Sequence, residues 1–338
     1  MAAGHPVPDE NGARAAEEVE GLLATATAED RVIALISGGG SALLPAPLPG
    51  ISLNDKAIVS QQLLAAGLDI TQMNLIRQSL SRLKGGGLLR AAAPAPVTAY
   101  ILSDVIGDDL RVIASGLTVS PIGTRAEAAD LLKSSRIWHS LPETVQAILS
   151  VPVLQVPPGT GVNILIGSNR KSLDAVLLAA GPGALLVDDR LTGDVGAAAD
   201  RIVASACQAE AAGCLLFGGE TTVTLRGTGL GGRNQELALR VAMQMPDIGR
   251  EWAFLSGGTD GRDGPTDAAG GLVDRLTLTR MRRSGGDPDV LLGNNDSYRA
   301  LAFAGDLLIS GATGTNVADV QILLLGPRQD DILQADTI

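Results

Sequence analysis

Residues 218–236 read GGETTVTLRGTGLGGRNQE, a short run of β-branched residues that leads into a turn dense in glycine. Glycine lets successive backbone N–H groups point into one concavity, a geometry that residues with a Cβ rarely adopt. We expect a helix to begin at Gly232, and its positive end would add to this cradle. The stretch therefore predicts a strand, a glycine turn and a helix that together hold an anionic small molecule.

Three other glycine turns follow apolar or helical stretches of the chain. They are SGGGS at Ser37–Ser41, KGGG at Lys84–Gly87 and SGGTDGRDGPTDAAGG at Ser256–Gly271. Phosphate cradles, carboxylates that can hold a metal and isolated basic residues are what phosphoryl transfer from a nucleotide requires. Four such turns in one chain predict an enzyme rather than a scaffold protein.

The chain is long enough for two domains, because 338 residues with 45% apolar content can bury two cores. We place the boundary near residue 205, which gives domains at 1–205 and 206–338. A net charge of −11 repels a phosphate backbone, and 2% aromatic residues leave no stacking platform, so nucleic acid is not an expected partner. An acidic chain that binds anions must concentrate its positive groups locally, which draws notice to Lys84 beside a glycine turn.

The sequence indicates a soluble, cytoplasmic protein. The first residues, MAAGHPVPDENG, have neither the basic start nor the apolar core of a signal peptide, and no apolar run is long enough to span a membrane. Cys207 and Cys214 do not have the spacing of a metal site or a redox pair, so we expect both thiols to be reduced.

Short apolar runs alternate with helical patterns along the first part of the chain. The expected strands are 32–36, 98–102, 162–166 and 184–187, and the expected helices are 13–24, 54–66, 71–83, 127–132, 170–180 and 194–212. This order predicts an α/β protein with a largely parallel sheet covered on both faces and ligands at the carboxyl ends of its strands. Closer strands are expected in the second domain at 215–217, 221–225, 252–255, 307–310 and 320–325. The two that flank Gly219–Glu220 indicate a hairpin there or a mixed sheet.

Arg233 is the strongest single candidate for function, because its planar guanidinium matches a carboxylate or a phosphate. The alternative is an arginine on the surface of a helix. Asp104 follows a strand in SDVIGDD and suits Mg²⁺ or a base, although helix capping also explains one aspartate there. Asp189 also follows a strand, where it serves in catalysis or forms a surface ion pair with Arg190. His5 in GHPVPDENG either contacts a ligand or belongs to the capped start of a helix.

Gly227, Gly229 and Gly232 also fit G-x-G-x-x-G, the turn that binds the pyrophosphate of a dinucleotide. That motif requires an acidic residue at the end of the next strand to hold the ribose. Glu251 instead precedes the next expected strand, and Ser256 follows it. A nicotinamide cofactor therefore has weaker support than ATP.

Eight segments in order along the chain resemble the type 2 glycerate kinases, whose C-terminal part is called the MOFRL domain. The segments are GHPVPDENG, SGGGSALL, LSRLKGGGL, SDVIGDD, ASGLT, GGETTVTLRGTGLGGRNQELAL, SGGTDGRDGPTDAAGG and GATGTNVADVQILLL. The resemblance implies a two-domain α/β enzyme, with a Rossmann-like first domain and a mixed sheet in the second. It also implies phosphorylation of D-glycerate from ATP with Mg²⁺, usually to 2-phosphoglycerate. Some members of that family carry the older name hydroxypyruvate reductase.

The N-terminus departs from the family pattern. Members of the family have a substantial segment before GHPVPDENG, with a first strand and a Gly-Lys element, whereas this sequence begins almost at the motif. Either the start is misassigned or the protein is a shortened copy that lacks an edge of its sheet and a cation near the transferred phosphate. An inactive ligand-binding homologue is thus one alternative function, and an NAD(P)H-dependent hydroxypyruvate reductase is the other.

For phosphoryl transfer, we expect ATP, Mg²⁺ and glycerate in a cleft between the two domains, because positioning and electrostatics provide most of the acceleration. Lys84 and the turn formed by Ser37, Gly38, Gly39, Gly40 and Ser41 would bind phosphate oxygens or the substrate carboxylate, and Arg233 would neutralise the transferred group. Asp104 or Asp189 would hold Mg²⁺ or take the hydroxyl proton, with Asp260 as the alternative metal ligand. The other expected contacts to substrate or nucleotide are Gly85, Gly86, Gly231, Gly232, Asn234, Glu220 and His5. We also allow for a homodimer.

Overall fold

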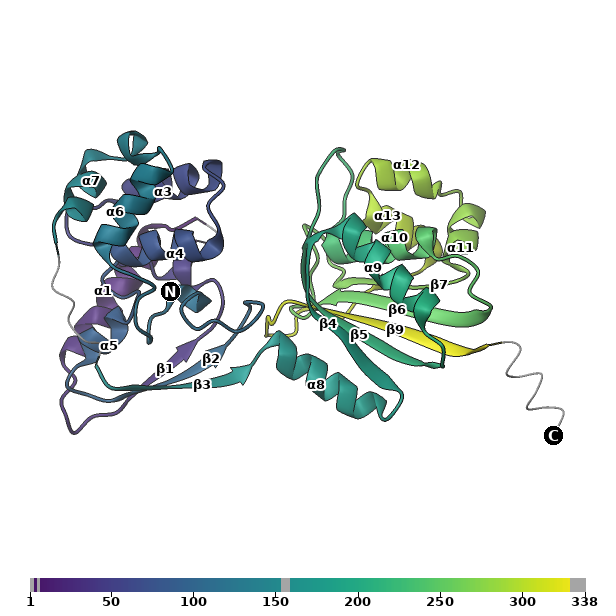
Figure 1. Ribbon diagram of the computed structural model, residues 1–338, viewed down its shortest axis with the longest axis horizontal. Helices are drawn as coiled ribbons and strands as arrows, with labels where there is room; N and C mark the ends of the chain where they lie inside the picture. The colour runs from purple at the N-terminus through teal and green to yellow at the C-terminus, as the bar shows by residue number, and fades with distance from the viewer. Residues whose placement is uncertain (1–2, 5–6, 153–158, 329–338) are drawn as a thin grey trace. The chain divides into compact units, whose positions relative to one another are not determined.

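The computed structural model describes residues 3–4, 7–152 and 159–328, and the chain divides into two compact units (Figure 1). Unit 1 is Met1–Ile166 and unit 2 is Gly167–Ile338. This division falls earlier than the expected boundary near residue 205. The reason is that the strand and the helix between residues 184 and 208 pack with the second unit.

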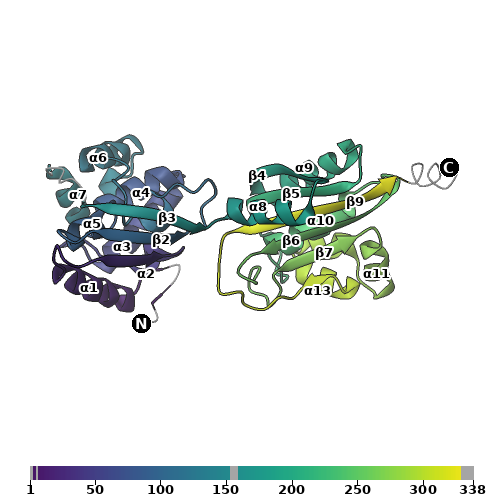
Figure 2. The same ribbon diagram turned by 90° about the horizontal axis from the view of Figure 1, so that it is seen from below.

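Unit 1 is built on a three-stranded parallel sheet (Figure 2). Its strands are β1 (Val32–Ile36), β2 (Val97–Leu102) and β3 (Gly161–Gly167), in that order across the sheet. Its helices are α1 (Glu10–Ala24), α2 (Gly40–Leu43), α3 (Leu53–Ala65), α4 (Ile70–Ser79), α5 (Gly87–Ala92), α6 (Arg125–Ser134) and α7 (Glu143–Ser150), with 3₁₀ turns at Ile113–Ser115 and Trp138–Ser140. The strand expected at 32–36 is confirmed, and the helix expected at 71–83 ends earlier, at Ser79.

Local sequence signals account for where three helices of unit 1 begin. Capping boxes, in which the N-cap side chain and the third helical residue exchange hydrogen bonds with each other's backbone, open α3, α4 and α6. The pairs are Ser52 with Asp55, Asp69 with Gln72, and Thr124 with Glu127. Each box satisfies backbone N–H groups that a helix leaves unpaired at its start.

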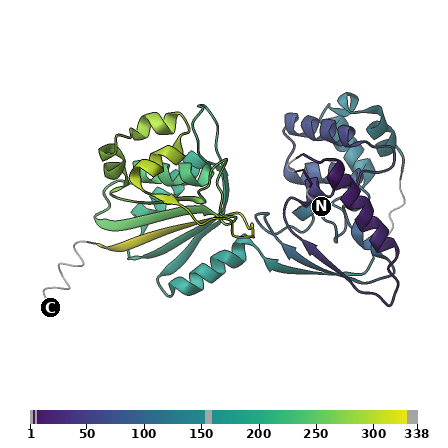
Figure 3. The same cartoon turned by 180° about the vertical axis from the view of Figure 1, so that it is seen from behind.

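The sheet of unit 1 is packed on one face and exposed on the other. Val32, Ala34 and Ile36 pack into the core that α1 and α5 complete. The views from below and from behind agree that the helices of unit 1 lie on that side (Figures 2 and 3). The opposite face carries exposed aliphatic side chains, namely Ile33 (67% exposed), Leu35 (80%), Val162 (57%), Ile164 (39%) and Ile166 (56%). The expectation that helices cover both faces is therefore wrong for unit 1.

Unit 2 contains the expected mixed sheet. Its strands, in order across the sheet, are β4 (Ala184–Asp194), β5 (Gly213–Thr222), β9 (Asp319–Arg328), β6 (Arg250–Gly258), β7 (Gly270–Asp274) and β8 (Leu307–Leu308). Only β4 and β5 pair in parallel, and the remaining described pairs are antiparallel. The expected hairpin at Gly219–Glu220 is wrong, because both residues continue β5 and pair with Leu191 and Thr192 of β4.

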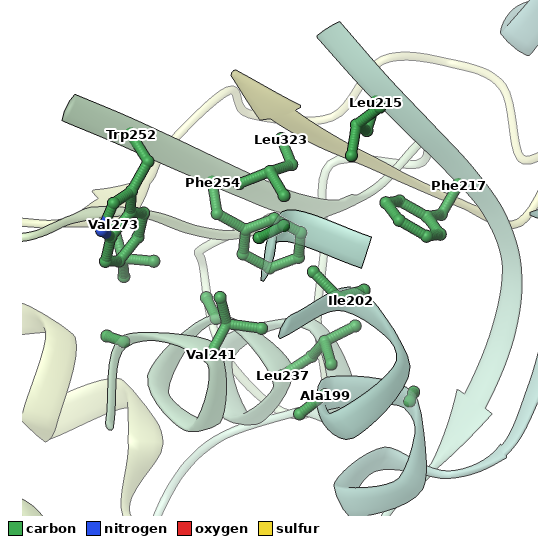
Figure 4. Packing of buried hydrophobic residues seen from close by; sticks show 14 of the residues in the cluster. Ala199, Ile202, Leu215, Phe217, Leu237, Val241, Trp252, Phe254, Val273 and Leu323 are labelled. Carbon is green, nitrogen blue, oxygen red and sulfur yellow. The ribbon is translucent and has the colours of Figure 1, made fainter. Parts of the chain in front are cut away.

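Helices cover both faces of the sheet in unit 2 (Figure 1). They are α8 (Asn169–Ala180), α9 (Val195–Gln208), α10 (Arg233–Gln244), α11 (Thr277–Arg283), α12 (Pro288–Gly293) and α13 (Ser297–Ala304). Figure 4 shows Ile202 of α9 and Val241 of α10 pointing toward Phe254 and Leu323 of the sheet. Leu173 of α8 packs against the other face. This core fixes the start of α10, where Arg233 stands.

Two predictions about chemical environment can be compared with the structure. Cys207 and Cys214 are both free thiols, as expected. Among the described residues, no helix is long and apolar enough to cross a lipid bilayer.

Candidate functional site

The Ser37–Ser41 turn connects β1 to α2 and meets Asp104 just beyond the end of the neighbouring strand β2. A Cβ built on Gly38 would lie 1.8 Å from Asp104 Oδ2, so the carboxylate lies directly against the glycine backbone. Within the described residues, no backbone N–H from Gly38 to Ser41 donates a hydrogen bond. This turn therefore keeps the free donors that an anion needs, beside a carboxylate that can accept a proton or a cation.

A chain of buried hydroxyl and amide groups holds the far side of this turn. Ser41 Oγ lies 2.5 Å from Ser115 Oγ, which donates to Asn74 Oδ1 at 2.8 Å. Ala114, Ser115 and Gly116 all adopt left-handed backbone conformations, with φ of 48°, 58° and 69°. Two successive residues other than glycine in this region store strain of about 1–3 kcal/mol each, a feature that clusters at functional sites.

Lys84 is buried beneath the same turn rather than exposed to a ligand. Its side chain is 2% exposed, and Nζ donates to the Ser41 carbonyl oxygen at 2.6 Å. Burial, followed by repulsion from Lys56 and Arg77, holds the pKa of Lys84 well below its usual value. In this structure Lys84 positions the turn.

The KGGG turn does not offer an open cradle. Gly85 N–H donates to Ser115 O at 3.2 Å, and Gly86 N–H donates to Gly116 O at 2.8 Å. These two bonds anchor the strained segment at Ser115. The glycines therefore shape the site through the backbone of Ser115, and a ligand contact at Gly85 or Gly86 stays a prediction.

In unit 2, the glycine-dense turn from Arg226 to Leu230 is filled by the protein itself. Asn295 Oδ1 accepts from Arg226 N–H at 2.7 Å and from Gly227 N–H at 3.0 Å. The neighbouring side chains of Asn294 and Asp296 accept from Thr228 N–H and Leu230 N–H at 3.0 and 3.1 Å. The anion cradle is therefore wrong for this part of the stretch, because these N–H groups already have acceptors within the chain. Among the described residues, Gly231 N–H and Gly232 N–H donate no hydrogen bond, so the ligand contact expected at these two glycines stays a prediction.

The start of α10 is likewise occupied by a carboxylate of the protein. Asp263 accepts from Asn234 N–H at 3.1 Å and from Gln235 N–H at 2.8 Å. A Cβ on Gly232 would lie 2.3 Å from Asp263 Cγ, which explains the glycine. Burial raises the pKa of Asp263 to about 6, although the two backbone hydrogen bonds oppose the shift. The helix end expected to hold a ligand anion therefore holds Asp263, and Gly231 packs against Ser297 Oγ.

Arg233 is held by two carboxylates at the first residue of α10. Its Nε and Nη2 donate to the two oxygens of Asp319 at 2.6 and 3.0 Å, and its Nη1 lies 2.7 Å from Glu220 Oε1. Burial lowers the pKa of Arg233, but the bonds from Asp319 outweigh that effect and raise it above its usual value. Because the side chain is 34% exposed, the guanidinium is oriented and still accessible. A contact between Arg233 and a ligand stays a prediction.

The carboxylates of Asp260 and Asp319 both lie near the backbone of Gly258. Measured from a Cβ position on Gly258, their Oδ1 atoms lie at 3.1 and 3.6 Å. Among the described residues, no group of three or more His, Cys, Asp or Glu converges as a ready metal site. Mg²⁺ often binds through one or two carboxylates together with substrate phosphates and water, and the residues at Gly258 fit that pattern.

Two further candidates lie elsewhere. Asp189 of β4 forms surface ion pairs with Arg170 at 3.0 Å and Arg190 at 4.0 Å, so the structure favours the ion-pair alternative. His5 lies outside the described residues.

The sequence did not single out Asp319, Ser115 or Asn74. Asp319 is 1% exposed and is separated from Arg233 by 86 residues. The only local signal was an acidic residue at the start of an apolar run in GTNVADVQ, a pattern that also fits a strand end on the surface.

Comparisons with known proteins match both units. Residues 1–150 match a family described as "Domain of unknown function (DUF4147)", and residues 213–319 match the MOFRL family. The chain is similar to the D-glycerate 2-kinase of Thermotoga maritima, with 41% identity over 96% of this chain and 79% of that protein. It is equally similar to a putative hydroxypyruvate reductase of Agrobacterium vitis, with 41% identity over 96% of this chain and 77% of that protein.

A solved structure resembles the whole fold. The crystal structure of glycerate kinase from Thermotoga maritima superposes with a TM-score of 0.87 and 39% identity, covering 96% of this chain and 80% of that one.

Proposed function

The chain belongs to the glycerate kinase family, and on that premise we propose that it transfers the terminal phosphoryl group of ATP to the 2-hydroxyl group of D-glycerate. The observation that carries the proposal is the turn at Ser37–Ser41. Its backbone N–H groups from Gly38 to Ser41 donate no hydrogen bond within the described residues, and the turn lies beside Asp104. The 41% identity to a D-glycerate 2-kinase over 96% of this chain supports the choice of substrate and position. A cytoplasmic location, where ATP is abundant, belongs to the same proposal.

In unit 1, the free N–H groups of the Ser37–Ser41 turn bind phosphate oxygens. Aligned backbone donors neutralise a polyanion without a counter-charge that must reorganise. Asp104 lies against the same turn and accepts the proton that leaves the substrate hydroxyl. Lys84 holds the Ser41 carbonyl oxygen and keeps the turn in place.

In unit 2, Arg233 stabilises the negative charge that spreads over the migrating phosphoryl group. Arg233 Nε and Nη2 donate hydrogen bonds to Asp319, and Nη1 forms an ion pair with Glu220. The guanidinium plane is therefore fixed before a ligand arrives. Preorganisation of this kind avoids reorganisation during the reaction.

Magnesium fits Asp260 better than it fits a closed cage of protein ligands. Asp260 and Asp319 bring two carboxylates to Gly258, but Asp319 is committed to Arg233. Asp260 would hold an ion that arrives with the nucleotide phosphates, and that ion would neutralise phosphate charge there.

The experiment is an assay of ADP release from ATP with D-glycerate, followed by ³¹P NMR of the product. Phosphate on C2 couples to a single proton and gives a doublet, whereas phosphate on C3 couples to two protons and gives a triplet. A doublet supports the proposal, and a triplet moves the transfer to the 3-hydroxyl. Binding of both substrates without ADP release would instead identify an inactive homologue.

Reduction of hydroxypyruvate is the second candidate, because one relative bears that name. The structure argues against a dinucleotide at G-x-G-x-x-G, since Asn294, Asn295 and Asp296 fill the turn and Asp263 occupies the helix start. The test measures, by absorbance and without ATP, whether the protein oxidises NADH or NADPH when hydroxypyruvate is added. Oxidation under these conditions would support the reductase.

A further inference from the structure

Unit 1 contains buried cations that have no carboxylate partner among the described residues. Lys56 is 8% exposed and donates to Pro45 O at 2.6 Å, and Lys84 donates only to Ser41 O. Arg77 of α4 is partly buried and has no hydrogen bond or ion pair from its side chain within the described part of the chain. Arg82 provides the contrast, because its guanidinium is paired with Glu20 at 2.6 Å. Arg82 thus has a carboxylate partner, whereas Arg77 has none among the described residues.

An unpaired charge is costly to bury, and proteins either pair such a group or let it lose its charge. Burial lowers the pKa of Lys56 to about 8, and it also lowers the pKa of Arg77. A lysine can release its proton near neutral pH, but a guanidinium retains its charge in proteins. Arg77 is therefore a permanent, partly buried positive charge that has no counter-ion among the described residues.

The position of Arg77 connects it to the Ser37–Ser41 turn. Arg77 follows Asn74 by three residues on α4, so the two side chains leave the same face of the helix. Asn74 accepts from Ser115, which bonds Ser41. The next residue, Gln78, donates to Ser115 O at 3.1 Å and fixes α4 against the strained segment. Arg77 therefore stands one helical turn from the groups that hold the turn with free N–H donors.

We propose that Arg77 binds an oxyanion of the substrates, either the carboxylate of glycerate or a phosphate of the nucleotide, next to the Ser37–Ser41 turn. The inference rests on the proposed kinase function and adds a binding residue to it. A guanidinium presents paired N–H donors that match both oxygens of a carboxylate or phosphate. Lys84, buried beneath the turn, acts as a positioning residue through its hydrogen bond to Ser41 O.

The test compares Arg77→Gln, Arg77→Lys and a control, Arg31→Gln, in the full chain. Arg31 is an exposed arginine of unit 1 that precedes β1. For each variant, kcat, the KM for D-glycerate and the KM for ATP are measured, together with the thermal unfolding midpoint. We expect Arg77→Gln to raise the KM of one substrate by about 10- to 100-fold, as for the loss of a charge-assisted hydrogen bond. The KM for the other substrate should stay within about twofold of the native value, and so should both KM values of Arg31→Gln, since the contacts to those substrates are intact.

The identity of the affected substrate distinguishes the two sources of the oxyanion. A higher KM for glycerate assigns Arg77 to the carboxylate, and a higher KM for ATP assigns it to a phosphate. Arg77→Lys should retain part of the affinity, because lysine keeps the positive charge but lacks the paired N–H donors of the guanidinium. The unfolding midpoint of Arg77→Gln should be unchanged or higher, since an unpaired charge is removed. Unchanged KM values, or a lower midpoint with both KM values raised equally, would overturn the inference.

Calorimetry with inorganic phosphate keeps this test separate from the kinase proposal. If the native protein releases no ADP, the proposed function fails, but phosphate binding still reports on Arg77. Affinity for phosphate that falls about tenfold in Arg77→Gln supports the site. Equal affinity in the native protein and Arg77→Gln refutes it.

Discussion

Replacement of Asp263 by asparagine should change how the free energy of unfolding depends on pH. Asp263 is 3% exposed and accepts two backbone N–H groups at the start of α10. Burial opposes ionisation of this carboxyl group, whereas the two N–H donors favour it. Asparagine keeps an acceptor oxygen at the helix start but carries no charge.

The magnitude follows from the difference between the folded and unfolded pKa values. The pKa of Asp263 rises from 3.8 to about 6 on folding, and each unit corresponds to about 1.4 kcal/mol. Between these values the folded state binds more protons than the unfolded state, so stability falls as pH rises. The native protein should therefore lose about 3 kcal/mol relative to Asp263→Asn between pH ~3 and pH ~7.

The assay is urea unfolding at a series of pH values, followed by the fluorescence of Trp252. Trp252 is 7% exposed in the core of unit 2, and a Trp138→Phe background removes the signal from the 3₁₀ turn in unit 1. The difference between the native protein and Asp263→Asn isolates one group from the other carboxylates that titrate in this range. A difference that stays constant with pH, or that changes in the opposite direction, would show that the helix N–H groups outweigh burial.

Arg233→Ala should lower kcat by about 100-fold or more, and it should also lower the unfolding midpoint because Asp319 would be left buried and unpaired. The double variant Arg233→Ala with Asp319→Asn should restore the unfolding midpoint without restoring kcat. Calorimetry measures the midpoint, and the ADP assay measures kcat. Gly38→Ala should abolish ATP turnover, since its Cβ would collide with Asp104, and a Gly21→Ala control on the surface of α1, where a Cβ meets no atom within 4 Å, should retain it. The pKa of Lys56 is about 8 in the folded state against 10.5 in the unfolded state, so between these values the unfolded state binds more protons and stability rises with pH. Relative to Lys56→Met, the native protein should gain about 3 kcal/mol of unfolding free energy between pH ~8 and pH ~10.5, as measured by urea unfolding. A difference between the two proteins that does not change with pH would contradict the burial of a charged amine.

Most elements of the fold could be predicted because their signals are local. The apolar run at 32–36 is β1, and capping pairs such as Thr124 with Glu127 mark where helices begin. The hairpin expected at Gly219–Glu220 failed because its signal was also local. Two glycine-flanked apolar runs looked like two strands, but pairing with Leu191 of β4 keeps β5 continuous, and that contact is invisible in a short window.

The candidate site was harder to predict because its partners are distant in sequence. The density of glycine at 227–232 predicted that backbone N–H groups converge on an anionic ligand. The groups at Gly227 come from the chain itself: a Cβ there would lie 2.4 Å from Asn294 Oδ1, and Asn295, 68 residues later, accepts the Gly227 N–H. The free donors at Ser37–Ser41 could not be told apart from the filled ones at Gly85–Gly86, since both read as clustered glycine. Only the tertiary fold decides which glycine turn remains open.

The uncovered aliphatic face of β1 and β3 has a practical consequence for handling this protein. Leu35 and Ile33 of β1 are 80% and 67% exposed on this face. Dyes such as ANS that brighten on apolar surface should bind the native state before any heating. Melting curves read with such dyes would start from a high baseline and hide the transition, so scattering and intrinsic fluorescence are the sounder probes, and dilute samples with mild detergent should suppress clumping through this surface.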